Sequence, residues 1–342
     1  MMKQKKRAKK NTTPQNPGVT VEPQVLLKGF VTRSTGSWYM VRENSGKIWE
    51  CRIVGKFRLD NMILTNPVAV GDEVQFFAEV EEENKGIINL ISPRRNYVAR
   101  QSPRQSHHLH LLASNINQAV VIVTVIEPHL KPGFIDRFLL MTEPQDIPAI
   151  IIFNKSDLYG ETEMAMYHQM REVYTSIGYE VMLVTAKDRT GLEALKETLQ
   201  HKTTLVCGQS GVGKSTLVNA IQPQLQLRTF EISDSSGKGQ HTTTFAEMFE
   251  LDFGGAIIDT PGIKTLSFNN LEPMQVTHNF RDMFRLSHDC KFGSACTHRS
   301  EPQCAVLAAL EAGTVSELRY MNYLQIREEV EEQNYWERHK SM

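Results

Sequence analysis

The stretch Thr203–Ser215, TTLVCGQSGVGKS, decides the fold. An apolar run, Thr203–Cys207, leads into Gly208–Ser215, whose spacing is G-x-x-x-x-G-K-S, and helix-forming residues follow. In such a strand–loop–helix unit the glycines let backbone N–H groups turn toward phosphate oxygens, and the start of the helix adds partial positive charge. The stretch therefore predicts a site for a nucleoside triphosphate and leaves the base open.

Individual residues of this loop have distinct expected roles. The Lys214 ammonium is expected to reach the β- and γ-phosphates and so to assist catalysis, and the Ser215 hydroxyl is expected to ligate Mg²⁺. An ordinary glycine-rich turn is the alternative, which the flanking strand and helix patterns disfavour. The residues expected to bind nucleotide here are Gly208, Gln209, Ser210, Gly211, Val212, Gly213, Lys214, Ser215 and Thr216.

Strand and helix patterns alternate around this unit. Short β-branched runs occur at 119–126, 149–153, 180–184, 203–207 and 255–258. Helical patterns separate several of these runs, at 133–143, 161–177, 191–200 and 214–221. This alternation predicts an α/β domain with a mostly parallel sheet that is covered on both faces.

Two further segments follow predicted strands and indicate which base is bound. Asn154-Lys155-Ser156-Asp157 resembles the guanine-specificity motif of GTPases, and Thr185-Ala186-Lys187 resembles their second base-contact loop. An Asp157 carboxylate would accept hydrogen bonds from guanine N1–H and the exocyclic amine, which adenine does not offer in that geometry. The Lys155 stem would cover the base. A phosphate-loop kinase or ATPase with loose base recognition stays open as the alternative.

The segment Asp259-Thr260-Pro261-Gly262 resembles the D-x-x-G motif of GTPases. Asp259 is expected to hold Mg²⁺ through water, and the Gly262 N–H to sense the γ-phosphate. Upstream, Gly239–Thr244 is expected to be a switch in which Thr243 ligates Mg²⁺, although Thr242 and Thr244 fit nearly as well.

The position after the D-x-x-G motif is Ile263, where many GTPases have a glutamine that orients water. Isoleucine cannot orient water, so intrinsic hydrolysis is expected to be slow. His241, within the predicted switch, is the candidate for orienting or deprotonating water. The alternative is that His241 is an exposed loop residue or contacts only a partner.

The motifs occur in an unusual order along the chain. GTPases normally run from the phosphate loop through the D-x-x-G motif to the base-reading motifs, whereas here Asn154–Asp157 and Thr185–Lys187 precede Gly208–Ser215. A circular permutation explains this order, because the site is assembled in space and the original termini need only lie close together. The predicted switches then lie directly before the C-terminal region.

Three cysteines and one histidine cluster near the C-terminus. Cys290, Cys296, His298 and Cys304 supply three thiolates and one imidazole, the composition of a closed structural zinc site. Scattered thiols are the alternative. The remaining cysteines, Cys51 and Cys207, lie in apolar strands and are expected in the core.

The N-terminal part differs from the rest. Six bases and no acid occupy residues 1–10, so the other residues carry 32 bases against 39 acids, a net charge of −7. Residues 1–20 are expected to be a disordered arm, either a solvated tail or an arm attracted to nucleic-acid phosphate. Residues 21–97 show about five short strands, which fit a β-barrel of oligonucleotide-binding (OB) type, although an SH3-like barrel would have a similar pattern. Residues 94–110 are polar and basic, as expected for a linker.

Several classes of protein are excluded by composition. The longest apolar runs hold only a few residues, far short of the roughly 20 needed to cross a bilayer, and no apolar stretch follows the basic N-terminus. Five cysteines in 342 residues do not make a disulfide scaffold. We therefore expect a cytoplasmic protein without a membrane partner.

Taken together, these motifs resemble those of the ribosome small-subunit-dependent GTPase A family (RsgA, YjeQ or YloQ) over about residues 22–342. The resemblance implies a multidomain protein with an OB-type barrel at 21–97, a circularly permuted GTPase domain at 98–277 and a helical zinc-binding domain at 278–342. It also implies GTP as substrate, GDP as product, Mg²⁺, one structural Zn²⁺, and hydrolysis stimulated by the small ribosomal subunit during late maturation. We expect a monomer.

An RNA partner suggests roles for the barrel. Trp38, Tyr39 and Trp49 are candidates for stacking on rRNA bases, with at least one of them in the core instead. The bases expected on the barrel rim are Arg33, Arg42, Lys47, Arg52, Lys56 and Arg58. A nucleotide-gated RNA-binding module without meaningful hydrolysis remains the alternative function.

Overall fold

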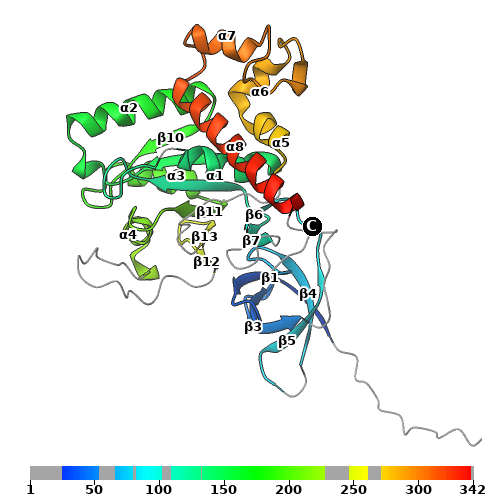
Figure 1. Ribbon diagram of the computed structural model, residues 1–342. Coiled ribbons are helices and arrows are strands. Elements are labelled where there is room, and N and C mark those ends of the chain that lie inside the picture. The colour runs from blue at the N-terminus through cyan, green and yellow to red at the C-terminus, as the bar shows by residue number, and fades with distance from the viewer. Residues whose placement is uncertain are drawn as a thin grey trace, which may run out of the picture.

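The fold was analysed in a computed structural model. It describes residues 25–53, 66–79, 82–101, 109–131, 133–227, 246–260 and 271–339. All statements of structure below concern these residues. Figure 1 shows the barrel at one end of the molecule, the sheet of the domain that the motifs predict to be a GTPase domain in the middle, and the C-terminal helices at the other end.

The N-terminal domain is a closed barrel of five strands. Its strands are β1 (Leu26–Ser34), β2 (Tyr39–Glu43), β3 (Ile48–Ile53), β4 (Glu73–Ala78) and β5 (Lys85–Ile91). They pair in the order β1-β2-β3-β5-β4, and β4 pairs again with β1 to close the barrel. Alternate residues point inward, so that Val31, Val41 and Phe76 fill a core with less than 1% exposure. The predicted OB-type barrel is confirmed.

The stretch expected to be a linker is partly a hairpin. Strand β6 (Tyr97–Gln101) pairs antiparallel with β7 (Leu109–Ser114). Val98 and Leu112 of this hairpin belong to the same buried cluster as the GTPase core. The expectation of a linker over 94–110 was therefore wrong for residues 97–101 and 109–110, which are strands. The many polar and basic residues of this stretch made its few inward-facing apolar residues hard to recognise.

The GTPase domain is built on a sheet with strand order β10-β9-β8-β11-β13-β12. All neighbours are parallel except β12, which is antiparallel to β13. The strands are β8 (Gln118–Val123), β9 (Ala149–Phe153), β10 (Glu180–Leu183), β11 (Thr203–Gly208), β12 (Glu247–Glu250) and β13 (Ala256–Asp259). The parallel α/β architecture predicted from the alternation of runs is confirmed.

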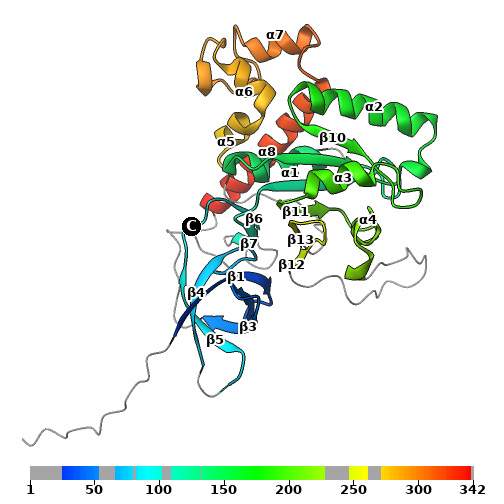
Figure 2. The same ribbon diagram turned by 180° about the vertical axis from the view of Figure 1, so that it is seen from behind.

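Helices cover both faces of this sheet. Helices α1 (Phe134–Thr142) and α2 (Glu161–Ser176) pack on one face, where Phe138 and Tyr167 are buried. Helices α3 (Leu192–Leu199) and α4 (Lys214–Ile221) pack on the other face. Figure 2 shows the molecule from behind, with these two helices labelled. Because the strands are covered on both faces, their sequences are continuous apolar runs. Short 3₁₀ turns lie at η1 (Glu143–Gln145), η2 (Ser156–Leu158) and η3 (Pro223–Leu225).

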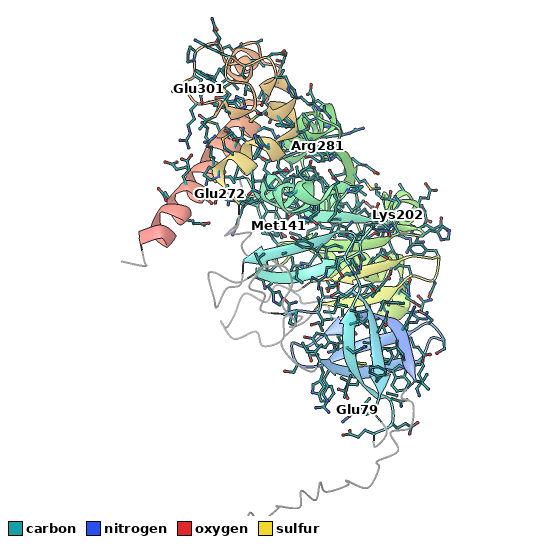
Figure 3. All side chains as sticks on the ribbon, turned by 90° about the vertical axis from the view of Figure 1, so that its right-hand side faces the viewer. Glu79, Met141, Lys202, Glu272, Arg281 and Glu301 are labelled. Atoms are coloured by element: carbon teal, nitrogen blue, oxygen red, sulfur yellow. The ribbon has the colours of Figure 1, made fainter. Side chains whose placement is uncertain are left out.

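The C-terminal region is helical. It contains α5 (Pro273–Asn279), α6 (Arg281–Ser287), η4 (Gly293–Ala295), α7 (Ala305–Glu311) and α8 (Glu317–His339). Helix α8, red in Figure 1, runs back over the GTPase domain, where Arg319 contacts Asp136 of α1. Arg281 donates to Glu143 at 2.7 Å, and Figure 3 shows Arg281 where the C-terminal helices meet the GTPase domain.

The barrel and the GTPase domain share one sheet. Strand β1 of the barrel pairs with β12, with Arg33 opposite Glu247, so that the two sheets join into one of eleven strands. No helix among the described residues is long and apolar enough to span a membrane. The domain boundaries near residues 97 and 277 stay predictions.

Candidate nucleotide and metal sites

The phosphate loop begins where β11 ends, between β8 and β13. Gly208 lies so close to β8 that an added Cβ would meet the Ile122 carbonyl oxygen at 2.5 Å. Gly213 has φ of +86°, which L side chains rarely adopt, and directly precedes α4. Lys214 folds back over the loop, and its Nζ donates to the carbonyls of Gly208 at 2.9 Å and Gln209 at 3.3 Å. The loop is thus curved around the Lys214 ammonium, the cation that the motif predicts for phosphate.

The predicted guanine motif contacts this loop directly. Asn154 Nδ2 donates to the Val212 carbonyl at 2.8 Å, although the two residues are 58 positions apart. An added Cβ on Gly213 would lie 2.6 Å from the same Nδ2, so the approach requires glycine there. The structure therefore brings together two motifs that the chain presents in permuted order.

The residues predicted to read the base also contact one another. Asp157 accepts a hydrogen bond from Thr185 Oγ1 at 2.6 Å, and Lys187 Nζ lies 3.5 Å from its second oxygen. The Thr185 hydroxyl also accepts from the Lys187 N–H at 3.2 Å, which fixes the loop that contains Ala186. Lys155 has φ of +62°, and its Nζ donates to the Glu127 carbonyl at 2.6 Å. The Asp157 carboxylate is oriented by these contacts.

Asp259 ends β13 beside the loop and is 7% exposed. Burial raises the pKa of Asp259 to about 6, although the Lys214 charge acts in the opposite direction. For Lys214, whose charged form is the protonated one, burial instead lowers the pKa. The loss of water disfavours both the Asp259 carboxylate and the Lys214 ammonium. A cation bound beside Asp259 and an anion bound beside Lys214 would therefore be strongly favoured.

Unsatisfied polar atoms concentrate at this site. Five buried side-chain atoms in the described part of the chain make no hydrogen bond, and three of them are Asn154 Oδ1, Gln209 Nε2 and Asp259 Oδ1. Buried polar atoms normally find a partner, so these three indicate a place completed by a ligand. The residues present therefore fit a nucleotide with its metal. Mg²⁺, when bound, would supply charge neutralisation of the phosphates.

The predicted residues differ in how far the structure places them. Ser215 lies half-buried in the first turn of α4, Thr216 is exposed there, and Ser210 and Gly211 are exposed in the loop. His241, Thr243 and Gly262 lie outside the described residues, as does Ile263. Their roles stay predictions.

The predicted zinc ligands converge. Cys290, Cys296, His298 and Cys304 are all buried, and their ligand atoms lie within 4.8 Å of one another. His298 Nδ1 is 3.3 Å from Cys304 Sγ, and Cys290 Sγ is 3.9 Å from Cys304 Sγ. A tetrahedral Zn²⁺ with bonds of about 2.3 Å to sulfur and about 2.0 Å to nitrogen requires ligand separations of about 3.5 to 3.8 Å. The cluster is therefore compatible with zinc.

Two residues that sequence reasoning missed support this cluster. The Ser287 hydroxyl lies 3.2 Å from His298 Nε2 and donates to the Met283 carbonyl at 3.0 Å, so it can accept from Nε2 and leave Nδ1 for a metal. Glu301 accepts from the Thr297 and Arg299 backbone N–H groups. Burial opposes ionisation, but the hydrogen bonds from Thr297 lower the pKa of Glu301 to about 2. Neither residue belongs to a ligand pattern, so only the fold identifies them.

Of the three aromatic residues expected as candidates for stacking on rRNA bases, two are buried in the barrel. Tyr39 is fully buried and Trp49 is 8% exposed, so both belong to the core, whereas Trp38 is half-buried with Lys85 Nζ 5.3 Å from its ring. Lys47 Nζ lies 4.2 Å from the Trp49 ring. Arg52, whose side chain is 51% exposed, pairs with Glu79 of the same barrel.

Two of the rim bases are held by the GTPase domain. Arg33 pairs with Glu247 and Arg42 with Glu250, both on β12. Lys56 and Arg58 lie outside the described residues. Arg33, Arg42 and Arg52 each pair with an acid that the local sequence does not reveal, and their contacts with rRNA phosphates stay predictions.

Comparisons with known proteins agree with this geometry. The family described as RsgA GTPase matches residues 91–269, and the RsgA N-terminal domain matches residues 28–88. A relative from Bacteroides thetaiotaomicron, named small ribosomal subunit biogenesis GTPase RsgA 2, is 47% identical over 90% of this chain and 99% of its own length. A relative from Christiangramia forsetii, named small ribosomal subunit biogenesis GTPase RsgA, is 46% identical over 90% of this chain and 98% of its own.

Solved structures give the same result. The crystal structure of YjeQ from Thermotoga maritima superposes with a TM-score of 0.70 at 32% identity, and covers 90% of this chain and 99% of that one. The structure of YloQ, described as a circularly permuted GTPase, gives a TM-score of 0.66 at 31% identity, and covers 90% and 96%. The similarity thus extends over the barrel, the nucleotide site and the Cys/His cluster together.

Proposed function

The chain belongs to the RsgA family of GTPases, and from this premise we propose that it is an assembly factor of the small ribosomal subunit. In this proposal it binds the subunit and its rRNA late in maturation, hydrolyses GTP when the subunit stimulates it, and leaves as the GDP form. The names of relatives more than 45% identical over 90% of the chain support the partner. We place it in the cytoplasm as a monomer.

The observation that carries the GTP-dependent part is the contact of Asn154 with the phosphate loop. The bond from Asn154 Nδ2 to Val212 ties base recognition to phosphate recognition. We assign guanine reading to Asp157, whose carboxylate is oriented by Thr185, with the loop Thr185–Lys187 at the base. Asn154 and Lys155 complete the base site.

We assign the phosphates to Gly208–Thr216, with Lys214 neutralising charge that develops on the transferred phosphoryl group. Ser215 and Asp259 are the proposed partners of Mg²⁺ on the described part of the chain, and Thr243 is the third. Gly262 would contact the γ-phosphate. His241 would orient the water that attacks the γ-phosphorus, forming GDP and phosphate.

The guanine assignment is tested by competition. Asp157→Asn removes an acceptor that guanine N1–H and the amine require, so GTP affinity should fall by more than tenfold while ATP affinity changes little. Fluorescent GDP displaced by GTP or ATP measures both affinities. Equal loss of the two nucleotides would contradict base reading by Asp157.

The zinc assignment is tested by metal analysis of the purified chain. We expect one Zn²⁺ per chain in the wild type and its loss in Cys296→Ser, because three ligands no longer close the tetrahedron. Cys51→Ser, which changes a thiol in the barrel core, is the control and should keep its zinc. Metal-free wild type would overturn the assignment.

The ribosomal assignment is tested by binding. The protein should sediment with isolated small subunits in the presence of a non-hydrolysable GTP analogue, and much less with GDP. Large subunits are the control. Equal binding to both subunits, or binding that ignores the nucleotide, would contradict the proposed cycle.

A further inference from the structure

The guanine motif is followed by a tyrosine whose hydroxyl returns to it. Tyr159 caps the short 3₁₀ turn η2, and its N–H donates to the Ser156 carbonyl at 3.2 Å. The turn reverses the chain, so the Tyr159 hydroxyl reaches the Asn154 carbonyl and donates to it at 2.8 Å. The residue that starts the motif is therefore held by a residue two positions beyond its end.

The same hydroxyl also contacts the segment that follows β8. The Val125 N–H donates to Tyr159 Oη at 3.0 Å. Since a carbonyl oxygen has no proton to donate, the hydroxyl accepts from Val125 and gives its own proton to Asn154. Burial raises the pKa of Tyr159 to about 12, so the hydroxyl keeps that proton at neutral pH. The hydroxyl is therefore a bridge of fixed direction between Val125 and Asn154.

The backbone that this bridge holds is unusual. Lys155 has φ of +62°, a left-handed conformation that residues other than glycine rarely adopt. Such a conformation persists where the surrounding structure fixes it from several sides. The Asn154 carbonyl belongs to the peptide that precedes Lys155, and it accepts from Tyr159. The Asn154 N–H donates to the Val123 carbonyl at 2.8 Å, so both polar groups of the Asn154 backbone are held.

The orientation of Asn154 matters because its side chain meets the phosphate loop. Asn154 Nδ2 donates to the Val212 carbonyl at 2.8 Å, and Asn154 Oδ1 is buried without a hydrogen bond. A shift of the Asn154 backbone would move both of these atoms together. A chain of hydrogen bonds thus runs from Val125 through Tyr159 and Asn154 to Val212.

We propose that Tyr159 is a positioning residue for the guanine nucleotide, which acts by holding Asn154, at the start of the left-handed turn, in the geometry that the base site requires. Tyr159 touches neither the phosphates nor the attacking water in this proposal, so it contributes to nucleotide affinity and not to the chemical step. Its ring packs against the apolar core, and only its hydroxyl has the positioning role. The inference rests on the proposed function, because it assumes that Asn154 takes part in binding guanine nucleotide.

The direct test removes only the hydroxyl. Tyr159→Phe keeps the ring that packs against the core and takes away the bond to Asn154. The affinity for GDP and for a non-hydrolysable GTP analogue, measured by calorimetry, should fall about threefold to tenfold, the range expected for one hydrogen bond. In turnover with small subunits, KM for GTP should rise by a similar factor, while kcat at saturating GTP should change by less than about twofold. A fall in kcat with unchanged affinity would overturn the positioning role.

The matched control is Tyr179→Phe. The Tyr179 hydroxyl donates to Glu143 at 2.9 Å, so the same group is lost from another hydrogen bond of the same domain. Tyr179 directly precedes β10, whereas the guanine motif follows the carboxyl end of the parallel strand β9, so the two tyrosines lie at opposite ends of these strands. Nucleotide affinity of the control should match that of wild type. An equal loss of affinity in both variants would indicate a general loosening of the domain and would overturn the proposal.

A second background shows whether Tyr159 acts through Asn154. Asn154→Ala removes the side chain that Tyr159 is proposed to position, so the further change Tyr159→Phe should then lower GDP affinity by less than about twofold. The same loss in both backgrounds would mean that Tyr159 acts elsewhere and would contradict the proposal. A wild type that binds ADP as tightly as GDP would instead refute the proposed function, so the two failures are distinct.

Discussion

The C-terminal helices meet the GTPase domain through buried charges, whereas the barrel meets β12 through charges that solvent reaches. Arg319 of α8 is 2% exposed and contacts Asp136 of α1 together with Asp282 of α6. Asn322 and Tyr174 complete the hydrogen bonds of Asp136, at 2.6 and 3.1 Å. At β12, by contrast, four partly exposed side chains make two separate pairs.

This difference indicates two kinds of attachment. Charges withdrawn from water must keep their partners, so the contacts of Arg319 fix the C-terminal helices to α1. Exposed charges exchange partners at small cost, so the two pairs at β12 hold the barrel much less firmly. The GTPase domain is therefore attached to the C-terminal helices through buried charges and, at β12, to the barrel through exposed charges.

The largest effect is expected from breaking the fixed attachment. Arg319→Met leaves Asp136 and Asp282 buried without their cation, which should lower the free energy of unfolding by about 3 to 5 kcal/mol. Denaturant unfolding of the full chain measures it. Lys196→Met, in an exposed pair, is the control and should cost less than about 1 kcal/mol. If Arg319→Met lowered the free energy of unfolding as little as Lys196→Met does, the two attachments would not differ in strength.

A somewhat smaller effect is expected at Asp72, the firm anchor of the barrel. Asp72 is fully buried just before β4, and it accepts two bonds of 2.6 Å from Arg94 and one of 2.6 Å from Ser114 Oγ at the end of β7. Asp72→Asn removes the carboxylate that binds Arg94, but Arg94 keeps its bond of 2.8 Å to the Pro67 carbonyl. We expect a loss of about 3 kcal/mol, at the low end for a broken buried pair. The shift in denaturation midpoint of the barrel measures this loss. A neutral substitution would show that the barrel has no firm anchor.

The nucleotide site between the two attachments predicts a dependence on pH. Since burial raises the pKa of Asp259 to about 6, the folded chain takes up a proton at this carboxyl as pH falls through 6. Mg²⁺ needs the ionised form, so its affinity for the nucleotide-bound chain should fall by up to about tenfold per pH unit below 6. In Asp259→Asn the Mg²⁺ affinity should depend on pH only through protonation of the nucleotide phosphates. Parallel profiles in the two proteins would exclude Asp259 as the titrating ligand.

The smallest effect on stability is expected at the joint between the barrel and β12. Glu250→Gln should change the free energy of unfolding by less than about 1 kcal/mol, because Arg42 becomes fully hydrated when its partner is lost. The same denaturant experiment measures it. A cost near that of Asp72→Asn would mean that β12 is a second firm anchor and would contradict the difference between the two attachments.

Sequence predicted the parts of the site that local motifs define. The loop Gly208–Ser215, the guanine motif Asn154–Asp157 and the Cys/His cluster each combine fixed spacing with a specific chemistry. Strand β9 and helix α4 were predicted with the observed bounds, because their apolar patterns begin and end at a loop or a glycine. The permuted order did not obscure the site, since each motif follows its own strand.

Sequence did not predict the joints. Arg319 and Asp136 are 183 positions apart, and Arg33 and Glu247 pair across strands of different domains. Such contacts depend on how whole elements pack, and neither partner carries a local signal. For the same reason the sequence, which suggested Arg33 and Arg42 as RNA contacts on the barrel rim, did not predict that they pair with acids of β12.

The central claim is that this chain hydrolyses GTP in response to the small ribosomal subunit. GTP turnover, measured with and without isolated small subunits, tests it most directly, with Lys214→Ala as the variant that cannot neutralise the phosphates. We predict low turnover of the wild type alone, a sharp rise on adding small subunits, and background turnover of Lys214→Ala in both cases. Equal wild-type turnover with and without the subunits would contradict the account.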